Sequence, residues 1–160
     1  MCNIATTRFN NVTFMENSRW REKNNWKGCI YPVPKQISNN FLLNELIFIL
    51  EMNNDSNKIK GVGLIKNRIS KKKYKIYSVQ NYNRYIYKSI YRIDRKEMTH
   101  EEKKVLRILD FLVFKGKTHL KRGQGIIFIP KWIKNNNKIN FVNLLKNLFN
   151  KKFNIFNSFS

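Results

Sequence analysis

The chain has 160 residues, and its 32 Lys and Arg against 10 Asp and Glu give a formal net charge of +22. Hydrophobic residues make up 42%, which excludes a wholly disordered chain, and the length suits one domain rather than two. The best apolar run, Leu46 to Leu50, is far too short to span a bilayer, and the N-terminal residues lack the pattern of a secretory signal. We therefore expect a soluble intracellular protein of the cytoplasm or nucleus, with Cys2 and Cys29 reduced.

The first half of the chain predicts strands interrupted by an irregular segment. Short apolar and Thr-rich pieces favour a strand between Ile4 and Met15, whereas the Trp, Gly and Pro residues of 16–36 favour a loop. An apolar run from Leu46 to Met52, a turn of short polar side chains and a return from Lys58 to Lys66 indicate a hairpin. Glycines at positions 61 and 63 indicate a bulge or close backbone packing in the return strand.

The second half predicts one further strand, a helix and a short final strand. Tyrosines alternate along residues 85–93, so one face of a strand there would carry their rings. Thr99 and Glu102 form the pattern of a capping box, which predicts a helix that ends near Lys115, before Gly116. Residues 126–129 read as a last strand that Pro130 ends.

These elements predict an α+β fold with one or two packed helices. The sheet would be either a small β-barrel or a curved, mostly antiparallel sheet, and it would occupy a single domain over residues 1–134. Residues 135–160 form a basic, Asn- and Phe-rich appendage in which apolar residues recur at helical spacing. We expect an amphipathic helix there, and residues 139–156 are a candidate docking helix for a protein partner.

The acidic residues are absent from two long stretches of the sequence, after Ser56 as far as Ile93 and again after Asp110. The first stretch interleaves cations with tyrosines, which favours a nucleic-acid partner because phosphates pair with cations while bases stack on rings. An AT-rich genome would also enrich Lys and Asn, and that alternative accounts for part of the charge. The residues predicted to contact phosphates are Lys71, Lys72, Lys73, Lys75, Arg84, Lys115, Lys117, His119, Lys121 and Arg122.

Catalytic and metal sites have little support in the sequence. Cys2, Cys29, His100 and His119 are the soft ligands of the chain, and none lies at a short ligand spacing. We therefore expect no metal, no cofactor and a non-catalytic protein. The alternative is an enzyme that processes nucleic acid, in which a few residues of one set do the chemistry: Glu16, Glu51, Asp94 and His119.

Large aromatic side chains gather in the predicted loop, where Trp20 and Trp26 lie close to Tyr31. Rings that flank a pocket can sandwich an unstacked base, and neighbouring Asn side chains or backbone can read its edge. The alternative is that both tryptophans close the open end of a barrel. Any choice between bases would therefore come from this segment, while the acid-free stretches would provide affinity.

The segment Trp26-Lys27-Gly28-Cys29-Ile30-Tyr31 resembles the Trp-x-Gly-Val-x-Asn opening of EVE domains, and its Trp and Cys resemble the Trp-Cys-Ser segment of YTH domains. Both families belong to the PUA-like group, and the resemblance covers about Asn24 to Asn67. It implies a small β-barrel that holds one base, either unmodified or modified, in an aromatic pocket. Tyr31 stands where the EVE pattern has Asn, so no particular modification is implied. The Lys- and Asn-rich composition also resembles that of proteins of large DNA viruses, which would act in an infected cell.

The function predicted from the sequence is therefore non-catalytic binding of RNA or DNA. The base pocket expected from the resemblance and the aromatic loop consists of Trp20, Trp26, Cys29, Tyr31 and Asn53. The two alternatives are the nucleic-acid-processing enzyme and an interaction protein that docks through its C-terminal helix.

Overall fold

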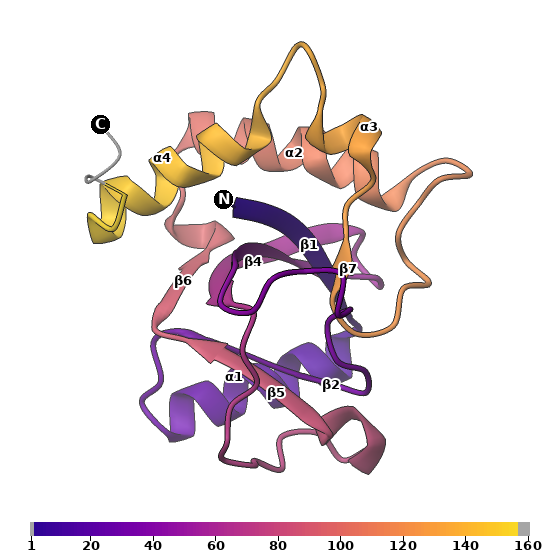
Figure 1. Cartoon of the computed structure of the whole chain (residues 1–160), viewed down its shortest axis with the longest axis vertical. Coiled ribbons are helices and arrows are strands. Elements are labelled where there is room, and N and C mark those ends of the chain that lie inside the picture. The colour runs from indigo at the N-terminus through magenta and orange to yellow at the C-terminus, as the bar shows by residue number, and fades with distance from the viewer. Residues whose placement is uncertain (1, 157–160) are drawn as a thin grey trace.

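The computed structural model describes residues 2–156, which form two β-sheets flanked by helices (Figure 1). The strands in this range are β1 (Cys2–Phe9), β2 (Cys29–Val33), β3 (Leu46–Asn53), β4 (Lys58–Lys66), β5 (Tyr85–Ser89), β6 (Tyr91–Asp94) and β7 (Ile127–Phe128). The helices are α1 (Asn11–Lys23), α2 (His100–Phe114), α3 (Lys131–Lys134) and α4 (Phe141–Phe153), with 3-10 turns η1 (Gln80–Asn83) and η2 (Arg95–Glu97).

Within the described residues, the larger sheet has five strands in the order β6-β4-β3-β1-β7. β1 runs parallel to β3, with Cys2 opposite Leu46 and Phe9 opposite Asn53, and the other neighbouring strands are antiparallel. β2 and β5 form a separate antiparallel pair. The expected α+β class and mostly antiparallel sheet with packed helices are confirmed. Across residues 2–156 the strands do not close into a barrel, so the open-sheet alternative is the one observed.

The two faces of the five-stranded sheet are covered by different layers. Figure 1 shows α2, α3 and α4 across one face, while α1 and the β2–β5 pair cover the other. Side chains alternate along β3, so Phe48 and Leu50 join the helical core while Ile47 and Ile49 join the core beneath β2 and β5. Each face therefore has its own buried cluster.

Helix α1 is the main difference from the predicted elements. Asn10 caps it, because the Asn10 side chain accepts a hydrogen bond from the Thr13 backbone N–H at 2.8 Å and Thr13 Oγ1 accepts one from the Asn10 N–H at 3.0 Å. The predicted first strand is therefore too long, and the predicted loop over residues 16–36 is wrong where α1 extends to Lys23 and again at β2, Cys29–Val33. The apolar residues of α1 lack helical spacing, and Asn17 is its buried residue, so periodicity did not reveal it.

The predicted strand over residues 85–93 is two strands in two sheets. β5 pairs with β2, whereas β6 pairs with β4, and the chain changes sheets at the exposed Ile90. Ser89 Oγ accepts a hydrogen bond from the Tyr91 backbone N–H at 2.9 Å, which supports this turn. The tyrosines consequently do not share a face: Tyr87 is buried in the smaller sheet, while Tyr91 packs edge-on against Phe153 of α4.

The predicted hairpin and both long helices predicted in the second half are present. α2 begins with the expected capping box between Thr99 and Glu102, and Gly116 after its end has a φ of 78°. α4 is amphipathic as expected, but Phe141, Leu145 and Phe149 are buried in the helical core. The apolar face of α4 therefore packs against the protein itself, so the predicted appendage is part of the folded domain as far as residue 156, and residues 157–160 lie outside the described residues.

Candidate nucleic-acid interface

Both predicted tryptophans lie beside one tyrosine and one lysine at the surface. Trp20, on α1, packs edge-on against Tyr74, with ring centroids 5.0 Å apart. Lys88, on β5, donates a 2.8 Å hydrogen bond to Tyr74 Oη, and its Nζ lies 4.9 Å from the centroid of the Trp26 ring. We call Trp20, Trp26, Tyr74 and Lys88 the aromatic cluster. It is held in place by β5 and α1, two elements of the same layer.

A cleft of about 490 Å³ adjoins the aromatic cluster and is called here the basic cleft. Its cations are Lys73, Lys75 and Arg84, and the rings of Tyr74 and Tyr85 contribute to its walls. The Arg84 guanidinium carbon lies 5.3 Å from the centroid of the Tyr85 ring, a cation–π geometry. Three of the residues predicted to contact phosphates therefore meet in one cleft with two aromatic rings.

Buried hydrogen bonds shape the segment that carries the cleft. Asn83 Oδ1 accepts hydrogen bonds from the backbone N–H groups of Ile76, at 3.1 Å, and Tyr77, at 2.9 Å. Its Nδ2 donates to the Tyr77 carbonyl oxygen at 2.8 Å. The Asn83 side chain therefore satisfies backbone groups of the loop between β4 and β5 that no strand pairs with. The lysines of this loop are all exposed: Lys71, Lys72, Lys73 and Lys75.

The other predicted phosphate contacts belong to a different part of the molecule. Lys115, Lys117, His119, Lys121 and Arg122 lie in the loop after α2, which Figure 1 shows beside the helical layer, away from the segment that precedes β5. Asn54 Nδ2 donates to the Lys121 carbonyl oxygen at 2.9 Å, and His119 Nδ1 accepts from the Lys121 N–H at 3.2 Å. The predicted cations thus form two groups.

Three residues of the predicted base pocket are buried, so that part of the prediction is wrong. Cys29 and Tyr31 lie between the two sheets, and burial raises the pKa of the Cys29 thiol to about 12, which keeps it neutral. Asn53 closes the hairpin turn, since its Oδ1 accepts from the Asp55 and Ser56 N–H groups. Trp26 Nε1 donates to the Cys29 carbonyl oxygen at 3.0 Å, which connects the half-buried aromatic cluster to this interior.

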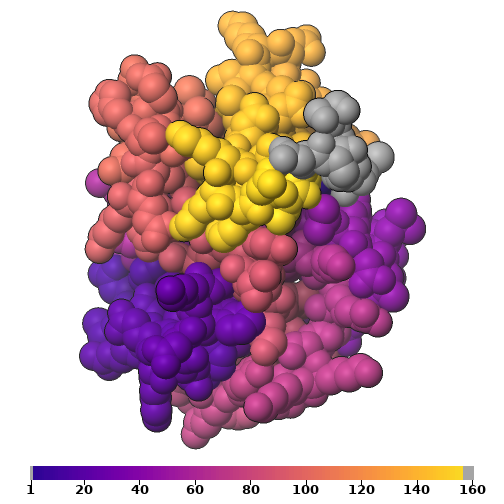
Figure 2. Space-filling model, turned by 90° about the vertical axis from the view of Figure 1, so that its left-hand side faces the viewer, coloured from indigo at the N-terminus to yellow at the C-terminus, as the bar shows by residue number. Residues whose placement is uncertain are grey.

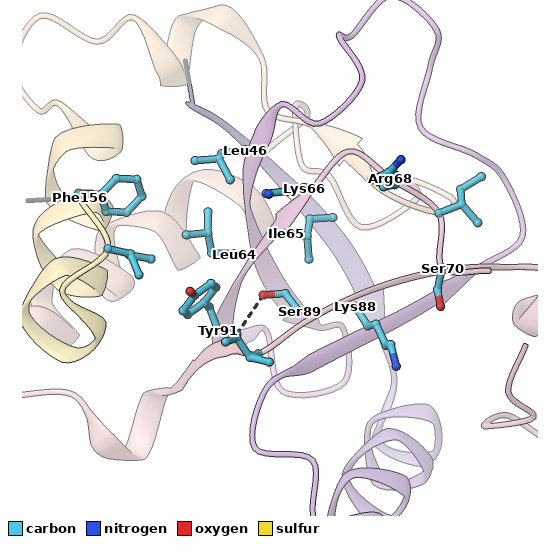
Figure 3. A pocket seen from close by; sticks show the side chains of 13 residues that line it. Leu46, Leu64, Ile65, Lys66, Arg68, Ser70, Lys88, Ser89, Tyr91 and Phe156 are labelled. Atoms are coloured by element: carbon cyan, nitrogen blue, oxygen red, sulfur yellow. Dashed lines mark hydrogen bonds between the residues drawn. The ribbon is translucent and has the colours of Figure 1, made fainter. Parts of the chain in front are cut away.

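A larger cavity, of about 580 Å³, lies where β5 and β6 separate (Figure 3). Leu64 and Tyr91 belong to its apolar lining, and Figure 3 shows it extending from Phe156 beside α4 to Ser70 and Lys88. Lys88 therefore borders both the cavity and the aromatic cluster. A pocket with an apolar floor and a few polar groups is the usual form of a small-molecule or base site.

A buried polar network lies under β2, and sequence reasoning missed it. Arg92 donates from Nε to Glu51 Oε2 at 2.9 Å and from Nη2 to Glu51 Oε1 at 2.7 Å, and Tyr31 Oη donates to Glu51 Oε2 at 2.6 Å. Arg92 Nη1 also donates to Asp94 Oδ2 at 3.1 Å. We call these four residues the polar network. The signals in the sequence were a glutamate within an apolar strand and the glycines opposite it.

The polar network keeps its carboxylate ionised. Burial alone raises the pKa of Glu51, but the charge of Arg92 and the hydrogen bonds from Arg92 and Tyr31 together lower it below its ordinary range. Burial raises the pKa of Tyr31 well above its ordinary value. Glu51 and Asp94, two of the residues named for the alternative enzyme, thus meet at Arg92, while Glu16 accepts from the Ser78 N–H and His119 lies in the loop after α2.

Across residues 2–156, no group of three or more His, Cys, Asp or Glu side chains gathers closely enough to hold a metal ion. In the same range, no helix combines the length and apolar character needed to cross a bilayer. Comparisons with protein-family models, curated proteins and solved structures gave no match. The PUA-like relationship therefore stays a prediction.

Proposed function

We propose that the protein binds single-stranded RNA or DNA without catalysis, through the aromatic cluster and the basic cleft. The observation that carries the proposal is the position of Tyr74, which contacts Trp20 and Lys88 and also lines the basic cleft. Bases stack on such rings while backbone phosphates pair with Lys73, Lys75 and Arg84. This ligand would be met in the cytoplasm or the nucleus.

Within this proposal, a base enters the cavity beside Lys88 and not the interior around Cys29. The cavity has an apolar floor that includes Tyr91, and its cations Lys66 and Arg68 suit the phosphate attached to a bound base. The net charge of +22 would speed the encounter with any polyanion. Choice of base would depend on the cavity, and affinity would depend on the cleft.

The test is fluorescence anisotropy with labelled single-stranded RNA and DNA of roughly 12 nucleotides, a length within the usual site size. The triple variant K73A/K75A/R84A is expected to bind more weakly and to lower the slope of log affinity against log salt by about 2, at about 0.7 per lost contact. The matched control K115A/K117A/R122A removes three exposed cations from the loop after α2. A salt-independent affinity, or an equal loss in both triples, would contradict the proposal.

A second pair of variants separates stacking from charge. Tyr74→Ala is expected to weaken binding by about 1–3 kcal/mol, the usual contribution of one stacked base, and Tyr74→Phe keeps the ring and should retain most of the affinity. Trp26→Ala should weaken some homopolymers more than others if Trp26 helps to select a base. If Tyr74→Phe lost as much as Tyr74→Ala, the ring would not be a stacking surface.

A further inference from the structure

A second cationic groove lies where the two layers meet at the start of β4. Arg95 lines it and pairs with Asp110, and five further cations come from three elements: Lys58 and Lys60 from β4, Lys96 from η2, and Lys103 and Arg107 from α2. The groove has a volume of about 470 Å³ and shares no lining residue with the basic cleft. We call it the β4–α2 groove. Figure 2 shows α1 (indigo) bordering α2 (salmon) on the side of the molecule where these elements meet.

The five cations face the groove for simple geometric reasons. Lys58 and Lys60 are two residues apart on a strand, so their side chains leave the same face, opposite the buried Ile59. Lys103 and Arg107 are four residues apart on α2, so they lie one above the other on the helix surface. Ile59 belongs to the core under α2, so Lys58 and Lys60 point to the side of the sheet that carries α1, where Lys60 Nζ lies 5.6 Å from the centroid of the Phe14 ring. The groove therefore runs past the edge of the sheet, and one wall is formed by the lysines of β4 and the other by the cations of η2 and α2.

These cations have no carboxylate partner within residues 2–156. The two carboxylates in the groove already serve other groups: Asp94 accepts from Arg92, and Asp110 accepts from Arg95 Nη1 at 2.8 Å. Asp94 and Asp110 reduce the positive charge of the groove, but its cations outnumber these two carboxylates. Such an arrangement repels itself unless an anion enters, and it attracts ligands with several negative charges.

The width of the groove is fixed by contacts between its walls. Asp110 Oδ1 accepts from the Ile59 backbone N–H at 2.8 Å, which joins α2 directly to β4. Arg95 Nη1 donates to the Ile59 carbonyl oxygen at 3.0 Å as well as to Asp110. Because these bonds hold β4, η2 and α2 together before any ligand arrives, binding would not require the walls to be ordered.

We propose that the β4–α2 groove binds a compact ligand with linked phosphate groups, such as inorganic tripolyphosphate or the polyphosphate chain of a nucleotide. Adjacent phosphates place several charges within a few ångströms, which suits cations contributed by several elements to one groove, and Arg107 adds a planar donor for a phosphate edge. The volume lies within the range of small-molecule sites, about 300–1,000 Å³. This site is separate from the proposed nucleic-acid interface and does not depend on it.

The test is isothermal titration of the full chain with inorganic tripolyphosphate, and with orthophosphate for comparison. We expect tripolyphosphate to bind the wild type more tightly than orthophosphate. The variants K58A/K60A and K96A/K103A/R107A, one for each wall, should each lower the affinity for tripolyphosphate by about tenfold or more, since each lost charge-assisted bond is worth about a factor of ten. The control K115A/K117A/R122A, in the loop after α2, should stay within about twofold of the wild type, because none of these residues lines the groove.

The proposal would be overturned by no binding of tripolyphosphate by the wild type, by an equal loss in the control K115A/K117A/R122A, or by a loss in one wall only. If both wall variants bind tripolyphosphate normally but bind the oligonucleotide weakly, the groove belongs to the nucleic-acid interface and the proposal is also wrong. NMR shift mapping on the wild type needs no variant. It should show changes at Lys58, Lys60 and residues 96–107 on addition of tripolyphosphate, and changes confined to the basic cleft would count against the groove.

Discussion

The two faces of the five-stranded sheet bury their side chains in different ways. The face under α2 and α4 is apolar, with Phe48, Leu50 and Met52 packed against residues of both helices. The face under β2 and β5 is apolar at Ile47 and Ile49 but carries an ionised carboxylate at Glu51, which is 2% exposed. One strand, β3, therefore serves a simple hydrophobic core on one side and a charged interior on the other.

On the face under β2 and β5, the side chains of Glu51 and Arg92 occupy space beside Gly61 that a larger residue would fill. A Cβ atom at Gly61 would lie 2.7 Å from Arg92 Nη2 and 2.9 Å from Glu51 Oε1. The register of β3 and β4 shifts at Glu51, which is the bulge expected from the glycines. Because Glu51 of β3 binds Tyr31 of β2 and Arg92 of β6, the network specifies how the smaller sheet sits on the larger one. The difference between the faces is that the helices pack by shape, whereas β2 and β5 are positioned by directed bonds.

Removal of Arg92 should have the largest effect. Arg92→Leu leaves Glu51 buried without its cation, and we expect the free energy of unfolding to fall by about 3–5 kcal/mol, measured by urea denaturation at neutral pH. The double variant E51L/R92L removes both charges and should be more stable than Arg92→Leu alone. If the single variant lost no more than the double variant, the ion pair would not be a coupled unit.

The stability of the wild type should fall on acidification, whereas the stability of Arg92→Leu should rise. In the wild type the pKa of Glu51 is lowered by Arg92, so its contribution to stability is present above about pH 4.3 and is lost as the pH falls through the folded pKa. In Arg92→Leu, burial would raise the pKa of Glu51, so the variant should gain stability on acidification. Urea denaturation at a series of pH values tests this, and parallel pH profiles would contradict it.

A large-to-small substitution in the core under α2 and α4 should lower stability without changing its pH dependence. Leu145→Ala in α4 removes a side chain that is 1% exposed in the helical core, and we expect a loss of about 2–5 kcal/mol. Between about pH 3 and 7 the pH profile should keep the shape of the wild type, because that cluster contains no Asp, Glu or His. Leu144, 38% exposed, is the matched control, and Leu144→Ala should lose much less. Equal and small losses would mean that α4 docks only loosely.

Elements with strong local signals could be predicted from the sequence, and those set by distant partners could not. The capping box at Thr99 and the apolar run of β3 with its polar turn are each readable over a few residues, and each is present. Helix α1 lacks helical apolar spacing and packs through the buried Asn17, which donates to the Ile30 carbonyl oxygen and to Tyr77 Oη. Tertiary contacts therefore stabilise α1, and no local pattern reports them.

The candidate site likewise has parts that the sequence predicts and parts that depend on contacts between distant residues. Lys73, Lys75 and Arg84 were predicted as phosphate contacts because charge is visible in the sequence, and the fold brings these three together. Glu51 and Arg92 are 41 residues apart, so their pairing has no local signature. The cavity beside Lys88 lies where the chain breaks at Ile90, because β5 pairs with β2 while β6 pairs with β4. These pairings are between distant segments, so the sequence does not predict the break.

The substitution of Gly63 tests the close approach of the two sheets. We expect it to reduce stability less than Arg92→Leu or Leu145→Ala does. A Cβ atom there would lie 2.2 Å from Tyr31 Oη and 2.8 Å from Cys29 Sγ, so Gly63→Ala must displace β2 and should destabilise the protein by about 1–3 kcal/mol in urea denaturation. Tyr31→Phe removes the nearest atom, so G63A/Y31F should lose less than the sum of the two single variants. Cys29 Sγ would still be crowded, which makes the rescue partial. Additive losses would contradict the close packing of β2 on β4, and the smaller sheet would then be held mainly by its apolar residues, as the helices are on the other face.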